Sequence, residues 1–271
     1  MLFDKVDNFN SDTCFITGEG KEIIYKDILK KADALSKDLT PRSLIFVLSE
    51  NNTQTFTGYL SFFRKGLVQM LLNSKISDDI LEKLIKTYLP NYIYSPISKS
   101  NVFKNYEILN KSEKYILLQL NKDNNYSINK DLALLLSTSG STGSKKFVRI
   151  SYENIYNNTK DIVKFLKINK NQKTITTMPP FYTYGLSIIN THLYTGASIV
   201  VTNLSTVEKK FWGLLNNQKV TSFGGVPYFY EILKKIKFNK LNLPHLQYFT
   251  QAGGALKKDL IKYFLDYSKK N

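Results

Sequence analysis

The chain has 271 residues, of which 42% are hydrophobic and 22% charged, so it can form one large or two small packed domains of ordinary globular composition. Its single cysteine, Cys14, excludes an internal disulfide, and no cysteines and histidines share the spacing of a zinc site. The first residues are acidic where a signal peptide is basic, and no apolar stretch reaches the roughly 20 residues of a membrane helix. We therefore expect a soluble, cytoplasmic protein without a membrane-spanning segment.

The net charge is +16, from 38 basic and 22 acidic residues, which is typical of nucleic-acid binders. The lysines are nevertheless dispersed along the sequence, singly or in pairs such as Lys30-Lys31 and Lys234-Lys235. A dispersed pattern favours a solvated surface over a nucleic-acid groove, so we expect no nucleic-acid partner. A positive field still raises the local concentration of a small polyanion.

Short aliphatic runs alternate with amphipathic segments through the first half of the chain. Residues 44–48 are apolar throughout, as in a strand covered on both faces. Apolar residues recur at helical spacing between Tyr25 and Leu39, and another helix begins after Ser77 and ends before Pro90. The predicted strands are residues 44–48, 67–72, 92–94 and 115–120, and the predicted helices include residues 25–39 and 53–65.

A polar stretch at residues 121–130 separates the two halves, and we predict domains at residues 1–125 and 126–271. In the second half, Ser151 is expected to cap a helix, with Asn154 where a capping box prefers Glu or Gln. The predicted strands there are residues 132–137, 147–150, 174–178, 198–202, 221–223 and 246–249, and the last helix is residues 256–269. Strands separated by helices of this length indicate an α/β fold with parallel βαβ units and helices on both sheet faces.

The loop after the strand at residues 132–137 is the sharpest chemical feature. Residues 138–145 contain five hydroxyl side chains and two glycines, and Lys146 follows. Glycines let successive backbone amides point into one concavity, hydroxyls add donors, and lysine supplies charge for phosphate oxygens. The end of a strand is also where ligands of α/β sheets bind. Composition alone leaves both an anion site and a flexible polar turn open.

Spacing excludes other phosphate and nucleophile motifs. A Walker loop has four residues between its glycines, whereas only two separate Gly140 from Gly143. The sequence contains no Gly-x-Gly-x-x-Gly opening a helix and no Gly-x-Ser-x-Gly elbow of a serine hydrolase. His192 and His245 have no carboxylate nearby in sequence, so we expect structural histidines, and Trp212 is expected in the core.

Residues 136–146 resemble the phosphate loop of the adenylate-forming superfamily, which includes acyl-CoA synthetases, luciferases and the adenylation domains of peptide synthetases. The usual pattern is Thr-Ser-Gly-Ser/Thr-Thr-Gly-x-Pro-Lys-Gly. Residues 138–143 match it fully, and Lys146 falls on its lysine. Lys145 stands where proline is usual and Phe147 where glycine is usual, but these departures spare every hydroxyl.

Other segments resemble the superfamily in the same order along the chain. Four of them resemble an early Tyr-x-Glu-Leu helix start, a strand ending in Asn, a Pro-x-Phe-His-x-x-Gly segment and a Gly-Gly/Ala-x-x-Leu turn, and they are residues 24–29, 46–51, 180–186 and 253–256. Residues 225–227 match the Gly-Val-Pro of the superfamily. Tyr182 stands in place of the common histidine. The chain is therefore identified as a member of this superfamily, similar to the first part of its large N-terminal domain.

The resemblance implies a reaction that joins a carboxylic acid to the α-phosphate of ATP, releases pyrophosphate and passes the acyl group to the thiol of CoA or a carrier protein. Thr142 and Lys146 would be catalytic, acting through positioning and electrostatics rather than as a nucleophile. Tyr182 would line the pocket for the acid. The implied nucleotide-binding residues are Thr138, Ser139, Gly140, Ser141, Thr142, Gly143, Lys146, Gly253, Gly254 and Ala255.

Members of the superfamily continue with a Tyr-Gly-x-Thr-Glu segment that helps to hold Mg²⁺, a ribose-binding aspartate and a C-terminal domain with a catalytic lysine, which this sequence lacks. We therefore expect the Mg²⁺ ligand outside this chain and assign no metal ligand within it. The expected function is ATP-dependent adenylation of an organic carboxylate by a fragment that needs further residues. Its exposed surface would favour a partner chain or self-association. A catalytically inert nucleotide-binding or scaffolding module is the alternative.

Overall fold

The computed structural model describes residues 2–103, 105–122, 127–137 and 146–269. The strands are β1 (Thr13–Thr17), β2 (Glu22–Ile24), β3 (Leu44–Ser49), β4 (Val68–Asn73), β5 (Tyr92–Pro96), β6 (Glu107–Lys111), β7 (Tyr115–Gln119), β8 (Leu132–Ser137), β9 (Phe147–Ser151), β10 (Lys173–Ile175), β11 (Ser198–Val201), β12 (Ser222–Gly225) and β13 (Tyr248–Gln251). The α-helices are α1 (Tyr25–Ser36), α2 (Thr53–Lys65), α3 (Asp78–Tyr88), α4 (Tyr152–Leu166), α5 (Thr183–Thr195), α6 (Lys209–Asn217), α7 (Pro227–Lys235) and α8 (Lys258–Ser268). Short 3-10 helices occupy Val6–Phe9, Ile97–Phe103 and Phe238–Lys240.

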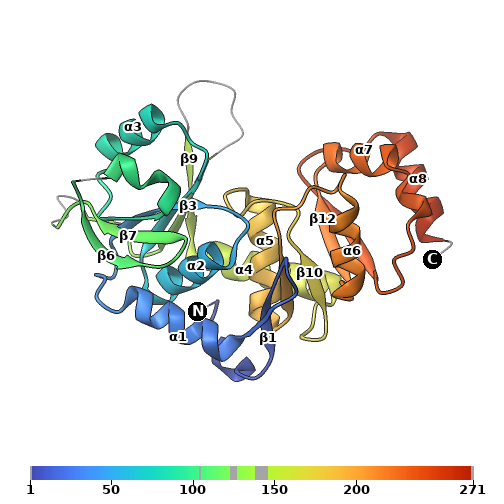
Figure 1. The fold of residues 1–271 in the computed structure, drawn as a ribbon, viewed down its shortest axis with the longest axis horizontal. Helices are drawn as coiled ribbons and strands as arrows, with labels where there is room; N and C mark the ends of the chain where they lie inside the picture. The colour runs from blue at the N-terminus through green and yellow to red at the C-terminus, as the bar shows by residue number, and fades with distance from the viewer. Residues whose placement is uncertain (1, 104, 123–126, 138–145, 270–271) are drawn as a thin grey trace.

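These elements form two sheets with helices between and around them, which confirms the α/β class (Figure 1). The larger sheet has seven strands in the order β6-β7-β5-β3-β4-β8-β9, and the smaller has six in the order β13-β12-β10-β11-β1-β2. Helices α2, α4 and α5 lie in the middle, α1 lies below α2 at the lower edge of the view, and α7 and α8 lie at the outer end of the smaller sheet (Figure 1). No described helix is long and apolar enough to cross a membrane.

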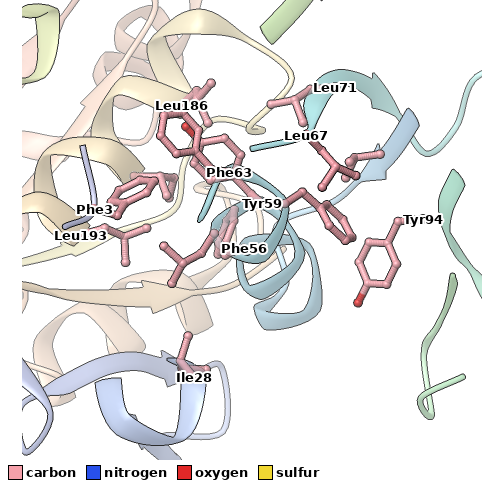
Figure 2. Close-up of a cluster of buried hydrophobic side chains, with 14 of the residues drawn as sticks. Phe3, Ile28, Phe56, Tyr59, Phe63, Leu67, Leu71, Tyr94, Leu186 and Leu193 are labelled. Carbon is pink, nitrogen blue, oxygen red and sulfur yellow. The ribbon is translucent and has the colours of Figure 1, made fainter. Parts of the chain in front are cut away.

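Strand β3 shows why the predicted apolar runs form strands that are buried on both faces. Ile45 and Val47 belong to the central hydrophobic cluster, whereas Phe46 belongs to a second cluster that includes Leu81 of α3. Successive side chains of a strand point to opposite faces, so an uninterrupted apolar run suits a strand between two helical layers. The central cluster contains residues from both sheets, and Figure 2 shows Phe56, Tyr59 and other side chains of α2 within it.

Helix α5 packs between the two sheets and helps to hold them together. Leu186 and Leu193 belong to the central cluster (Figure 2), and the Tyr59 hydroxyl of α2 donates a hydrogen bond to Asn190 Oδ1 at 2.9 Å. A helix that is apolar on most of its surface is typically buried between layers. The position of α5 therefore depends on both halves of the molecule.

Several predicted elements are confirmed. Helix α2 has the predicted bounds, and α4 begins after the predicted cap residue, Ser151, which forms a capping box with Asn154. In that box the backbone N–H of Asn154 donates to Ser151 Oγ at 3.0 Å, and the backbone N–H of Ser151 donates to Asn154 Oδ1 at 3.2 Å. Asparagine at this position can accept the return hydrogen bond, which explains why the box forms without Glu or Gln.

The sheets differ from the expected parallel arrangement in four places. Strand pairs β1–β2, β5–β7, β6–β7 and β8–β9 are antiparallel. Strands β1, β2 and β6 were not predicted, and β6 is exposed along its length, so it carries no hydrophobic periodicity. The sheets also exchange strands across the predicted division at residues 125 and 126, because β1 and β2 join the smaller sheet and β8 and β9 the larger. The two domains, 1–125 and 126–271, stay a prediction.

Candidate functional site

A cavity of about 650 Å³ lies between α4, α5 and the strands β10, β12 and β13. This volume is within the ~300–1,000 Å³ of small-molecule sites. Its wall is mainly apolar and includes Leu166, Ile188, Phe223, Thr250 and Gly253. Strands β10, β12 and β13 run parallel, so the cavity reaches the carboxyl ends of β12 and β13, where ligands of α/β sheets bind.

Glycines allow α5 to close on the sheet beside the cavity. A Cβ atom on Gly224 of β12 would lie 2.6 Å from the Tyr184 hydroxyl and 2.8 Å from Ile188 Cδ1. At the start of α5, a Cβ atom on Gly185 would lie 2.4 Å from the Pro179 carbonyl oxygen. Both distances are shorter than van der Waals contact, so these positions require glycine for close approach.

Tyr184 connects α5 to β13 across the edge of the cavity. Its hydroxyl lies 2.7 Å from Thr250 Oγ1, within hydrogen-bond distance. Burial raises the pKa of Tyr184, although the hydrogen bond with Thr250 opposes this shift. The hydroxyl therefore stays protonated at neutral pH, and Tyr184 acts as a neutral wall of the cavity.

The segment after β13 forms the mouth of the cavity. The Ala252 N–H donates to the Gly225 carbonyl at 3.3 Å, and the Gln251 side-chain amide donates to the Gly254 carbonyl at 2.7 Å. Gly253 has a φ of +85°, a left-handed conformation that favours glycine. Gly253 lines the cavity, whereas Gly254 and Ala255 lie beside it as exposed residues. This turn presents backbone to a ligand without a side chain in the way.

His192 lies at the buried end of the cavity wall. Its Nδ1 is 2.9 Å from the Ile188 carbonyl oxygen and 3.3 Å from Thr191 Oγ1. Burial lowers the pKa of His192 to about 4, so the imidazole is neutral at pH 7. The histidine is buried as expected, but it is not fully satisfied, because Nε2 has no hydrogen-bond partner in the described structure.

The predicted phosphate loop lies mostly outside the described residues. Thr138, Ser139, Gly140, Ser141, Thr142 and Gly143 all fall in the segment that the structure does not describe. Its described flanks, Ser137 and Phe147, are opposite each other in the antiparallel pair β8–β9. Lys146 is exposed directly before β9. The roles of these residues stay predictions.

The structure places Tyr182 and Tyr184 differently. Tyr182 is the N-cap residue of α5, is 48% exposed and is not among the residues that line the cavity. Tyr184, on the first turn of the helix, does line it. The role of Tyr182 in the acid pocket stays a prediction, and Tyr184 is a site residue that sequence reasoning missed. A signal was available, since Tyr184, Ile188 and Thr191 recur at helical spacing on one face.

The described residues contain no group of three or more histidine, cysteine, aspartate or glutamate side chains that could hold a metal ion. The single cysteine, Cys14, is buried, and burial raises the pKa of its thiol well above the ordinary value. A buried thiol of this kind is inert as a nucleophile.

The sequence was compared with families and with individual proteins of known function. The profile of the AMP-binding enzyme family matches residues 2–270. The chain belongs to the AMP-binding enzyme family. Bacitracin synthase 3 of Bacillus licheniformis is 23% identical to this chain over 256 aligned residues, and the match covers 90% of this chain and 4% of that protein.

A second relative and a solved structure are also similar to this chain. The 2-succinylbenzoate–CoA ligase of Lactococcus lactis subsp. lactis (strain IL1403) is 24% identical to this chain, and the match covers 88% of this chain and 52% of that protein. The structure of o-succinylbenzoate CoA synthetase from Bacillus subtilis, in complex with the acyl-adenylate intermediate OSB-AMP, has a TM-score of 0.79 at 16% identity, covering 98% of this chain and 56% of that one. This likeness shows the fold, and the chain spans about half the length of the ligase and of the synthetase.

Proposed function

We propose that this chain binds ATP and an organic carboxylic acid for adenylation, as part of an acid–thiol ligase. The observation that carries the proposal is the cavity that opens at Gly253. The backbone turn expected to hold the adenine and an apolar cavity large enough for an acid meet at that residue. Family membership supports ATP as the nucleotide, and an acyl-adenylate is bound by the structurally similar o-succinylbenzoate CoA synthetase.

In this proposal each part of the chain has a separate task. Gly253, Gly254 and Ala255 lie along the adenine, and the apolar wall of the cavity holds the body of the acid. Residues 138–143 and Lys146 hold the phosphates, with Thr142 and Lys146 stabilising the charge that develops during the transfer. Catalysis then consists of alignment and electrostatic stabilisation, and it needs no protein nucleophile.

The proposal extends to the other participants in the reaction. The acyl acceptor is the thiol of CoA or of a carrier protein, and Mg²⁺ accompanies the ATP phosphates. The ligand of that Mg²⁺ is proposed to lie outside this chain, and a partner chain or self-association would complete the site. The whole reaction is proposed to take place in the cytoplasm.

Titration calorimetry of MgATP into the chain tests the nucleotide part of this proposal. Removing a charged phosphate ligand by Lys146→Ala should weaken binding by about 10- to 100-fold, because hydrogen bonds to charged groups contribute about 1.5–3 kcal/mol. Lys170→Ala is the matched control, since Lys170 is also exposed but lies in the α4–β10 connection. Equal binding by the wild type and both variants would contradict the role of Lys146. Nucleotide binding without any binding of carboxylic acids would favour the inert nucleotide-binding module.

A further inference from the structure

The cavity extends along α5, whose residues from Thr183 to His192 contribute to its wall. Tyr184 and His192 are eight residues apart in one helix, a separation of about 12 Å along the axis. Tyr184 contacts Thr250 near the carboxyl end of β13. Beyond His192 the chain turns into β11, whose first residue, Ser198, pairs with Lys173 at the start of β10. His192 is therefore at the end of the cavity that is farthest from Gly253.

The strands give the same order of residues. Ser222 is paired with Thr174 and with Tyr248, and all three line the cavity. Gly224 and Thr250 are paired two residues farther along their strands, about 7 Å closer to the mouth. The end of the cavity thus consists of His192 and this row of three residues.

Most polar groups in the wall are already paired within the protein. Thr174 Oγ1 donates to the Ser222 carbonyl at 3.2 Å, and the Tyr248 hydroxyl donates to Gln172 Oε1 at 3.4 Å. Thr191 Oγ1 donates to the Ile188 carbonyl at 2.9 Å. His192 Nε2 differs, because it is buried without a partner in the described structure. An unpaired buried polar group costs stability, and a bound group that pairs with it removes that cost.

The hydrogen bond at Nδ1 determines what Nε2 can do. A carbonyl oxygen only accepts hydrogen bonds, so the 2.9 Å contact with Ile188 places the proton of the neutral ring on Nδ1. Nε2 then carries a lone pair and can accept a hydrogen bond. Nε2 is buried and His192 lines the cavity, so a ligand donor would have to enter this end of the cavity to pair with Nε2.

We propose that His192 Nε2 accepts a hydrogen bond from a hydroxyl or amide N–H group at the far end of the bound acid. This inference rests on the proposed function and narrows its substrate class to acids with an apolar body and a distal, uncharged hydrogen-bond donor. His192 is then a specificity-determining residue. An acid that lacks the donor leaves Nε2 unpaired and binds more weakly.

The test compares the binding of straight-chain ω-hydroxy acids with that of the unsubstituted acids of the same length, by calorimetry on the whole chain with MgATP present. The best ω-hydroxy acid should bind about tenfold more tightly than its unsubstituted counterpart. His192→Phe keeps a planar ring but removes the acceptor, so the ratio of the two affinities should fall to about one. His245→Gln is the control, because His245 is exposed and outside the cavity, and it should keep the wild-type ratio.

Nitrogen-15 NMR of ring-labelled histidine gives a readout that needs no variant, since the chain has only 2 histidines. The Nε2 resonance of His192 should shift when the ω-hydroxy acid binds and stay in place when the unsubstituted acid binds. Equal affinities, an unmoved Nε2 resonance, or a ratio that persists in His192→Phe would overturn the inference and leave the proposed function standing. If neither kind of acid binds, the proposed function fails and the inference fails with it.

Discussion

The hydroxyl oxygens of Tyr184 and Thr250 lie 2.7 Å apart. This contact joins the first turn of α5 to β13, although the residues are 66 positions apart in sequence. The Tyr184 hydroxyl also lies over Gly224, where a Cβ atom would come within 2.6 Å of it. One tyrosine thus sets the spacing between α5 and the sheet at the edge of the cavity.

The hydrogen bond between Tyr184 and Thr250 should be measurable as a coupling energy. Tyr184→Phe and Thr250→Val each remove one partner, and the double variant should be more stable than the sum of the two changes implies by about 1 kcal/mol. Urea denaturation of the wild type and the three variants measures this coupling. Strictly additive changes in the free energy of unfolding would show that the contact contributes nothing.

Gly224→Ala should destabilise the chain by about 1–3 kcal/mol, because the added methyl group overlaps Tyr184 and Ile188. Gly213→Ala in α6 is a matched control, since a Cβ atom there meets nothing within 4 Å. The control should be stabilised by roughly 0.5–1 kcal/mol, as alanine is favoured over glycine within a helix. Thermal unfolding measures whether Gly224→Ala is destabilised and Gly213→Ala is stabilised. A neutral Gly224→Ala would mean that α5 is not held tightly against β12.

Ser151→Ala should cost about 1 kcal/mol of stability, because it removes the side-chain oxygen that caps α4. Ser77→Ala is the control. Ser77 is the N-cap residue of α3, but its side chain makes no capping hydrogen bond. Ser77→Ala should therefore lower the stability less than Ser151→Ala does. Denaturant titrations of both variants measure the difference. An equal loss in the two variants would contradict the capping box.

His192 should make folding sensitive to acid. Its pKa falls from the ordinary value near 6.5 to about 4 in the folded chain, so the unfolded chain binds this proton more readily. The stability that comes from burying the neutral ring is therefore fully present above about pH 6.5 and is lost as the pH falls toward 4. One pKa unit corresponds to 1.36 kcal/mol, so about 3 kcal/mol should be lost over this range.

The measurement is the free energy of unfolding of the wild type and of His192→Phe between pH 7 and pH 4. Carboxylates titrate in the same range, so the difference between the two proteins isolates the histidine. This difference should move in favour of the variant as the pH falls. Parallel curves would show that His192 is not buried in a neutral state.

Strands with a continuous apolar run and helices with a clear apolar face could be predicted because local sequence determines them. The run at residues 44–48 is apolar since β3 is covered on both faces, and α2 has an apolar face bounded by a capping Asn52 and by Gly66. Strand β1 was missed because its buried run is only three residues long and, besides its short neighbour β2, its partner is β11, almost two hundred residues away. Such a pairing leaves no local pattern.

The candidate site was predictable only in part. Residues 138–146 and 253–255 form local motifs, and Gly253 does lie at the mouth of the cavity. The cavity itself is assembled from α4, α5, β10, β12 and β13, so its shape depends on tertiary structure. The start of α5 at Thr183 leaves Tyr182 half exposed as the N-cap residue and turns Tyr184 toward the sheet. Sequence periodicity alone does not predict the first residue of a helix to within two residues.

The central claim is that one continuous site holds both the nucleotide and the acid. A non-hydrolysable acyl sulfamate of adenosine carries both parts in one molecule, and its affinity for the chain can be compared by calorimetry with that of AMP and of the free acid. Because binding one part raises the effective concentration of the other, the conjugate should bind on the order of 100-fold more tightly than either. Gly224→Ala should reduce this advantage and leave the affinity for AMP unchanged. A conjugate that binds no more tightly than AMP would contradict the account.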